Sequence, residues 1–191
     1  MVSASIKSSE IRFGECNKKL LEEVIFYGIS LGADFVELFI ENSDNSSVLA
    51  EEDFITNVSP SFSKGAGIRI FKDKRDGFVS TNDLSKHGLM RSISQAIEML
   101  DISKKTNKLI FNGLEKLKDY SKSKINWLNE VPTINEVSEK LLLSTKSLKK
   151  DKKVVVRKGS YARNWQEVII ASSDGTYATD IRLHQTVGLN I

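Results

Sequence analysis

The sequence is poor in cysteine, proline and histidine, and each shortage excludes a class of protein. It contains one cysteine, two prolines and two histidines in 191 residues, and no apolar run has the length of a membrane span. Cys16 cannot form a disulfide within the chain, which is typical of a reducing cytoplasm. The first fifteen residues lack the apolar stretch and small-residue cleavage site of a secretory signal. We therefore expect a cytoplasmic protein that does not associate with membranes.

Metal ligands and nucleophile motifs are also scarce. Neither His87 nor His184 has a second histidine or a cysteine at the spacing of a zinc site, and no His-Glu pair occurs. Serines are abundant, but no Gly-x-Ser-x-Gly elbow is present. The glycines of Gly65-Ala66-Gly67 lead into a predicted strand instead of a helix N-terminus, so they do not predict a phosphate loop. The sequence assigns no catalytic residue and no metal ligand.

The charge is nearly balanced. A formal net charge of +3 is too small to predict a nucleic-acid-binding protein. The lysines gather in residues 101–130 and 149–153, with few aromatic side chains between them. This pattern favours a solvated linker and a solvated helix face over a nucleic-acid groove.

Three segments show the apolar spacing of amphipathic helices. The first is predicted over 16–31, with Gly32 as its end, because glycine enters the left-handed conformation without strain. The second follows Ser85, a hydroxyl suited to capping free backbone N–H groups, and its apolar stripe runs to Leu100. The third begins at Thr133, which has capping-box spacing to Glu136.

Between these helices, alternating apolar residues and turn residues predict short antiparallel strands. Residues 34–41 alternate clearly, and 42–47 is rich in the Asn, Asp and Ser of turns. The clearest hairpin joins 67–72 to 78–81 through residues 73–77, with Gly77 expected at positive φ. The other predicted strands are 48–51, 54–58, 154–158, 166–172, 177–183 and one starting near Gln185.

Strands joined by tight turns, with helices beside them, predict an α+β fold. We expect a loose leader over 1–17, an N-terminal α+β domain over 18–100 with antiparallel strands and flanking helices, and a lysine-rich linker over 101–130. Residues 131–191 are expected to begin a central α+β domain, a helix followed by a strand meander that is incomplete at Ile191.

Several segments together resemble the TldD/PmbA family, described as modulators of DNA gyrase. Gly65-Ala66-Gly67-Ile68-Arg69-Ile70-Phe71 and Gly77-Phe78-Val79-Ser80-Thr81-Asn82-Asp83-Leu84-Ser85 are similar to its first-domain signature. Glu167 to Gly175 resembles its central domain. Phe78 favours the TldD branch over the PmbA branch. Ile181 and Leu183 depart from the family's Asp-Thr-Arg-Pro run, of which Asp180 and Arg182 remain.

The resemblance implies a cytoplasmic zinc-dependent peptidase that cleaves unstructured peptides or unfolded proteins, as a homo- or heterodimer with a related subunit. The family's zinc ligands belong to a His-Glu-x-x-x-His helix, which this sequence lacks. We therefore expect a non-catalytic N-terminal region that binds no cofactor itself, whereas the full-length family member binds zinc. The residues that the resemblance suggests for a channel wall or subunit interface are Arg69, Asn82, Asp83, Asp180 and Arg182.

A second interpretation remains open. The same strands and helices could form a stand-alone protein-binding adaptor without enzymatic activity. The sequence that follows Ile191 in the gene separates the two interpretations, because only the peptidase requires a metal-binding helix there.

Overall fold

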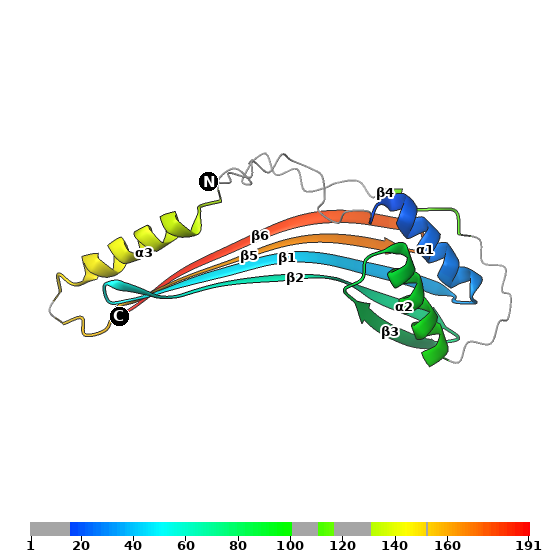
Figure 1. Ribbon diagram of the computed structural model, residues 1–191, viewed down its shortest axis with the longest axis horizontal. Coiled ribbons are helices and arrows are strands. Elements are labelled where there is room, and N and C mark those ends of the chain that lie inside the picture. Colours follow the sequence, from blue (N-terminus) through cyan, green and yellow to red (C-terminus); the bar gives the residue numbers. More distant parts are fainter. Residues whose placement is uncertain (1–15, 101–110, 117–130, 152) are drawn as a thin grey trace.

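The computed structural model describes residues 16–100, 111–116, 131–151 and 153–191. Most of the expected leader and most of the lysine-rich linker lie outside these ranges. The described residues form one sheet and three helices (Figure 1). The helices are α1 (Lys18–Ser30), α2 (Lys86–Met99) and α3 (Ile134–Leu148), and the strands are β1 (Phe35–Glu51), β2 (Phe54–Lys72), β3 (Arg75–Thr81), β4 (Glu115–Lys116), β5 (Lys158–Ser172) and β6 (Thr176–Asn190).

The sheet has the order β3-β2-β1-β5-β6-β4 and confirms the predicted α+β class. Five of its strands are antiparallel to their neighbours, and the two-residue β4 runs parallel to β6. The strands on either side of the predicted linker meet where β1 pairs with β5, from Glu37 with Ser172 to Glu51 with Lys158. Segments more than a hundred residues apart in sequence therefore share one sheet.

The long strands correct the prediction of short ones. Residues 42–47 are not a turn but the middle of β1, and residues 59–66 continue β2 without interruption. Cross-strand partners hold the polar residues of 42–47 in place: the Asn42 amide donates to the Glu167 carboxylate at 3.0 Å, and Asp44 pairs with Arg163 at 3.6 Å. Pairing with strands on both sides outweighs the local turn preference, because strand propensity depends strongly on tertiary context.

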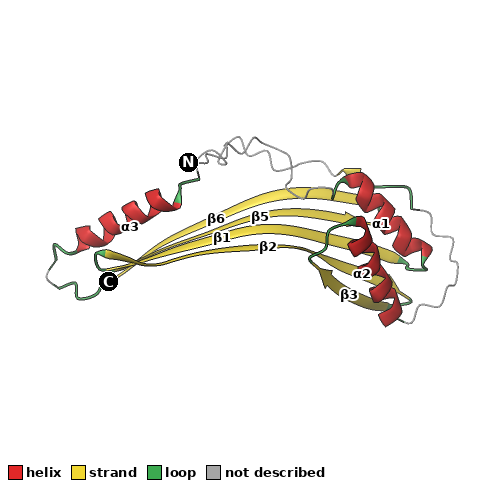
Figure 2. Cartoon of the chain, in the orientation of Figure 1, coloured by secondary structure: helices red, strands yellow, loops and turns green. Residues whose placement is uncertain are grey.

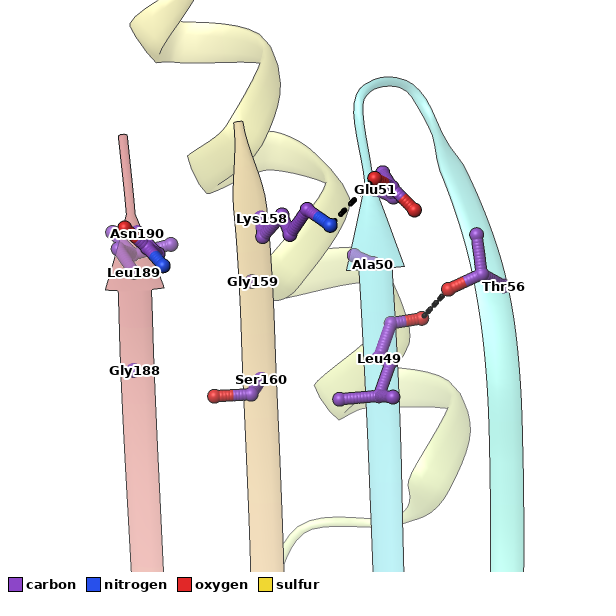
Figure 3. Close-up of a pocket in the computed structure, with 10 residues that line it drawn as sticks. All are labelled: Leu49, Ala50, Glu51, Thr56, Lys158, Gly159, Ser160, Gly188, Leu189 and Asn190. Atoms are coloured by element: carbon purple, nitrogen blue, oxygen red, sulfur yellow. Dashed lines mark hydrogen bonds and ion pairs between the residues drawn. The ribbon is translucent and has the colours of Figure 1, made fainter. Parts of the chain in front are cut away.

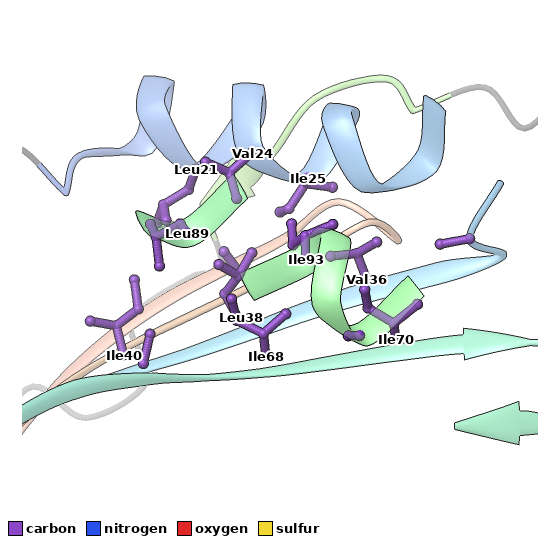
Figure 4. Close-up of a cluster of buried hydrophobic side chains, with 14 of the residues drawn as sticks. Leu21, Val24, Ile25, Val36, Leu38, Ile40, Ile68, Ile70, Leu89 and Ile93 are labelled. Atoms are coloured by element: carbon purple, nitrogen blue, oxygen red, sulfur yellow. The ribbon is translucent and has the colours of Figure 1, made fainter. Parts of the chain in front are cut away.

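The main core lies between one end of the sheet and the helices α1 and α2 (Figure 4). Val36, Leu38 and Ile40 alternate along β1 toward these helices and are fully buried. Three further strand residues and five helix residues complete the centre of this core: Ile68, Ile70, Ile169, Leu21, Val24, Ile25, Leu89 and Ile93. The helix periodicities predicted from the sequence thus correspond to the faces that are buried.

Helix α3 covers the other end of the same face. Its Val137 and Leu141 pack against Val48, Ala50 and Tyr161 in a second, smaller core. The predicted capping box is present, with the Thr133 hydroxyl accepting from the Glu136 backbone N–H at 3.2 Å and the Glu136 carboxylate accepting from the Thr133 N–H at 2.8 Å.

A buried arginine ties α3 to the turn between β1 and β2. Arg157 donates to the backbone oxygen of Thr145 at 3.1 Å and to the Asp53 carboxylate at 3.3 Å, and it also pairs with Glu52. Since the Arg157 side chain is only 8% exposed, its charge requires these acceptors. This cluster fixes the end of α3 over the β1–β2 hairpin.

The hairpin between β2 and β3 is confirmed, but the predicted role of Gly77 is wrong. The turn consists of Asp73 and Lys74, both at positive φ (48° and 66°) as in a type I′ turn. Gly77 lies within β3, where a Cβ atom would come within 3.2 Å of the Ala96 backbone oxygen and of the Leu100 side chain. A side chain there would press on α2, which packs directly on the strand.

This correction predicts opposite effects of two substitutions in one hairpin. Gly77→Val is expected to reduce the free energy of unfolding by about 1–3 kcal/mol, the usual cost of overpacking. Lys74→Gly is expected to be neutral or to stabilise by up to about 1 kcal/mol, because glycine adopts positive φ without strain. Urea denaturation of both variants measures the difference. Equal stabilities of the two variants would contradict the packing of α2 on Gly77.

Candidate functional site

The three helices leave one face of the sheet uncovered in the described part of the chain. The β1 residues that contact α1 and α2 and those that contact α3 all have even numbers, so both groups point to the same side of the strand. Figure 2 shows α1 and α2 near one end of the long strands and α3 near the other. We call the opposite side, which carries the odd-numbered residues of β1 and their cross-strand partners, the bare face.

Two hollows lie next to each other on the bare face. One measures about 360 Å³ and lies over residues 45–47 of β1, 162–164 of β5, and Ser59, Ser61, His184 and Thr186 of the outer strands. The other measures about 330 Å³ and lies over 49–51, 158–160 and 188–190, with Thr56. The strand register places the two hollows one after the other along the same four strands, β2, β1, β5 and β6. We call the two hollows together the trough.

The outer end of the trough is closed by an ion pair. Figure 3 shows Lys158 and Glu51 joined across β5 and β1, with α3 behind the strands, and their charged atoms are 2.9 Å apart. Thr56 is the extra residue of a bulge opposite Leu49 and Ala50, and its hydroxyl donates to the Leu49 oxygen at 3.3 Å. The bulge bends the β2 edge at this end of the trough.

Apart from Leu49 and His184, small uncharged side chains of the bare face line the rest of the trough. Gly188 leaves room beside Ser160, since a Cβ atom on that glycine would come within 2.8 Å of the Ser160 hydroxyl. The Asn164 amide donates to the Asn45 side chain across the floor. Ser46 and Arg163 also border the trough in the middle of their strands, but strand alternation points their side chains to the opposite, helix-covered face. The trough therefore offers hydroxyl and amide groups together with the apolar side chain of Leu49.

Three of the sequence-predicted residues lie on the bare face, outside the trough. Arg69 on β2 donates to the Asp76 carboxylate at 3.0 Å and lies over the Phe71 ring at 4.7 Å. On β6, Arg182 donates to the Asp180 carboxylate at 2.7 Å. Each arginine already has a carboxylate partner, so neither is a free cation.

Asn82 and Asp83 lie in the loop that leads into α2. Hydrogen bonds from the side chain and backbone of Ser85 hold the pKa of Asp83 below its usual value. Arg91 also donates to Asp83 at 3.3 Å. A Cβ atom at Gly88 would come within 2.2 Å of the Asp83 carboxyl carbon, so the close approach of this carboxylate requires glycine. Asp83 thus organises the start of α2.

The structure does not gather the five predicted residues into one site. Arg69 is level with Glu37 and Ser172, whereas Asp180 is level with Val168 and Glu41. With strands about 4.8 Å apart and residues about 3.4 Å apart along them, the Arg69 and Asp180 backbones are about 20 Å from each other. They mark two separate places on the bare face.

No metal centre is present among the described residues. Nowhere in these ranges do three or more His, Cys, Asp or Glu side chains come together in a way that could hold a metal ion. His184 lies on the bare face and His87 lies in the first turn of α2, so they belong to different faces of the sheet. The side chains described here do not fit a zinc site.

The trough was missed by the sequence prediction. Its β1 part overlaps the Asn-rich and Ser-rich run that was interpreted as a turn, and its remaining lining comes from three other strands. The available signal was the alternation of Ser59, Ser61 and Ser63 with Pro60 and Phe62 between them. That alternation is typical of a strand face without an apolar cover.

Two family models match the chain on either side of the lysine-rich segment. Residues 36–100 match the model described as "PmbA/TldA metallopeptidase domain 1", and residues 127–191 match the "PmbA/TldA metallopeptidase central domain". Together they cover about two-thirds of the sequence. This chain belongs to the PmbA/TldD metallopeptidase family. The match confirms the resemblance seen in the glycine-rich strand and the Gly-Phe-Val-Ser-Thr run.

A curated relative supports this family assignment. The chain is 23% identical over 159 residues to a protein named "Metalloprotease TldD homolog" from Buchnera aphidicola. The alignment covers 78% of this chain and 30% of that relative. The chain thus spans less than a third of the length of the PmbA/TldD protein that it matches.

Solved structures of other proteins share the fold of this chain. TldE from Thermococcus kodakarensis is similar with a TM-score of 0.69 and 21% identity, over 89% of this chain and 39% of that one. A putative modulator of DNA gyrase from Thermotoga maritima gives 0.67 and 13% identity, over 88% and 38%. At these identities the likeness concerns the fold.

In the described part of this chain, no helix has both the length and the apolar character needed to cross a membrane.

Proposed function

We propose that this chain is a non-catalytic region of a zinc-dependent peptidase that cleaves unstructured peptides, and that its bare face forms a wall of the substrate channel. The observation that carries the proposal is the long sheet with helices on one face and a trough on the other. A wall requires a rigid backbone behind an accessible surface, and β1 is paired on both sides along nearly its whole length.

The metal chemistry belongs to the whole protein in this proposal. A zinc ion bound by three protein ligands activates a water molecule for attack on the peptide bond. The described residues do not bring such a ligand set together, so their part is to contact and align the substrate. The single cysteine supports a cytoplasmic location, since one thiol cannot form a disulfide within the chain.

Metal content and peptide cleavage test this proposal. After loading with zinc and dialysis against zinc-free buffer, the 191-residue chain is expected to retain no zinc and to cleave no unstructured peptide. The whole protein is expected to bind about one zinc per chain and to lose cleavage after chelation. A 191-residue chain that holds one zinc and shows chelator-sensitive cleavage would contradict the non-catalytic assignment. A whole protein that binds no zinc and cleaves no peptide would favour the adaptor function.

A second candidate function for the same face is contact with a related subunit. The specific observation is a group of aromatic side chains at the α1 and α2 end of the bare face. Phe78 is 61% exposed and lies across Gly67, and Phe39 is 36% exposed. Phe35 and Phe71 lie beside them with ring centroids 5.8 Å apart. Exposed aromatic clusters of this kind are typical of protein–protein contacts.

Two phenylalanines of equal exposure distinguish a specific subunit contact from nonspecific association through any exposed aromatic side chain. Phe78→Ser on the bare face is expected to weaken self-association, or association with a related subunit, by about tenfold or more. Phe26→Ser is the matched control, because Phe26 is also 61% exposed but lies on α1. Sedimentation velocity over a range of concentrations gives both dissociation constants. An equal effect of the two variants would exclude the aromatic group as a specific contact.

A further inference from the structure

We propose that the trough holds about six residues of an extended, uncharged stretch of substrate polypeptide, and that it excludes charged side chains. This inference rests on the proposed peptidase function and assigns its substrate class to one surface.

The length of the trough matches an extended peptide. Along β1 it runs from Asn45 to Glu51, and along β5 from Asn164 to Lys158. At about 3.4 Å per residue, this is about 20 Å, or about six residues of extended chain.

The lining can bind a peptide backbone without regard to sequence. Ser47, Ser59, Ser61, Ser160 and Thr186 are hydroxyl residues, each able to donate and accept a hydrogen bond. Backbone N–H and C=O groups of an extended peptide need such partners when water is displaced. Ala162 and Gly188 leave space between the hydroxyls for the backbone to approach.

Charge is confined to the two ends. At the outer end, Glu51 and Lys158 neutralise each other at 2.9 Å. Beyond the inner end, Asp180 and Arg182 do the same at 2.7 Å. Of the trough residues between them, His184 is the titratable side chain that alternation places on the bare face. A charged substrate side chain lying in the trough would therefore exchange part of its water for groups that offer it no unpaired charge, which costs free energy.

Direct binding tests this inference separately from cleavage. The probe is a fluorescein-labelled twelve-residue unstructured peptide of Ser, Ala, Asn, Gly and Leu, titrated with the 191-residue chain and followed by anisotropy. Ala162→Trp fills the floor of the trough and is expected to weaken binding by about tenfold or more. Leu143→Trp is the matched control, because Leu143 is 68% exposed on α3, on the other side of the sheet; it is expected to bind like the unmodified chain.

A second variant and a second probe keep the outcome decisive. Thr186→Trp fills the same place from β6, since Thr186 pairs with Ala162, so it serves if Ala162→Trp does not fold by circular dichroism. Replacing the four central probe residues by Asp, or by Lys, is expected to weaken binding by about tenfold in both cases. The inference would be overturned if the tryptophan variants bound the uncharged probe as the unmodified chain does. It would also be overturned if the Asp-substituted and Lys-substituted probes both bound the unmodified chain as tightly as the uncharged probe.

The remaining outcomes are also informative. If the tryptophan variants abolish a dimer of the chain without changing peptide binding, the trough is a contact between copies and the inference is wrong. If the trough fails these tests while the whole protein binds zinc and cleaves peptides, the peptidase proposal stands without the trough. If the whole protein does neither, the peptidase proposal fails independently of the trough.

Discussion

The pairing of β1 with strands on both sides is the constraint on which the rest of the structure depends. β1 pairs with β2 from Phe35 to Glu51 and with β5 from Glu37 to Glu51. Because a one-residue shift would move every side chain to the other face, the buried alternation of Val36, Leu38 and Ile40 fixes the register of all three strands. Both cores and the bare face follow from this register.

This constraint also explains how one surface can extend past two separate helix clusters. The helices α1 and α2 bury one end of the even-numbered face and α3 buries the other, with Arg157 holding α3 to the β1–β2 turn. Along the trough, the opposite face carries small polar residues, which are those of a surface that meets water or another chain, whereas its exposed aromatic side chains gather at the α1 and α2 end. A rigid sheet with one free face is a suitable wall for the channel that we propose.

The sequence predicted the helices well because their signals are local. Ser85 and Thr133 cap α2 and α3 as expected, and Gly32 follows the end of α1 at positive φ. The strand lengths could not be predicted, because the partners that hold Asn42 and Asp44 extended are Glu167 and Arg163, more than a hundred residues away. For the same reason the trough, built from four strands, had no single motif. The resemblance to the PmbA/TldD family was visible in residues 65–85, where local sequence and fold agree.

Amide hydrogen exchange of residues 42–47 tests the central claim, the continuity of β1, most directly. In a strand paired on both sides, each of these amides donates to β2 or β5, so exchange requires separation of the sheet. We predict that residues 42–47 exchange as slowly as residues 36–40, within about tenfold. Exchange of 42–47 at the rate of an exposed turn, with 36–40 protected, would contradict the continuous sheet and the bare face built on it.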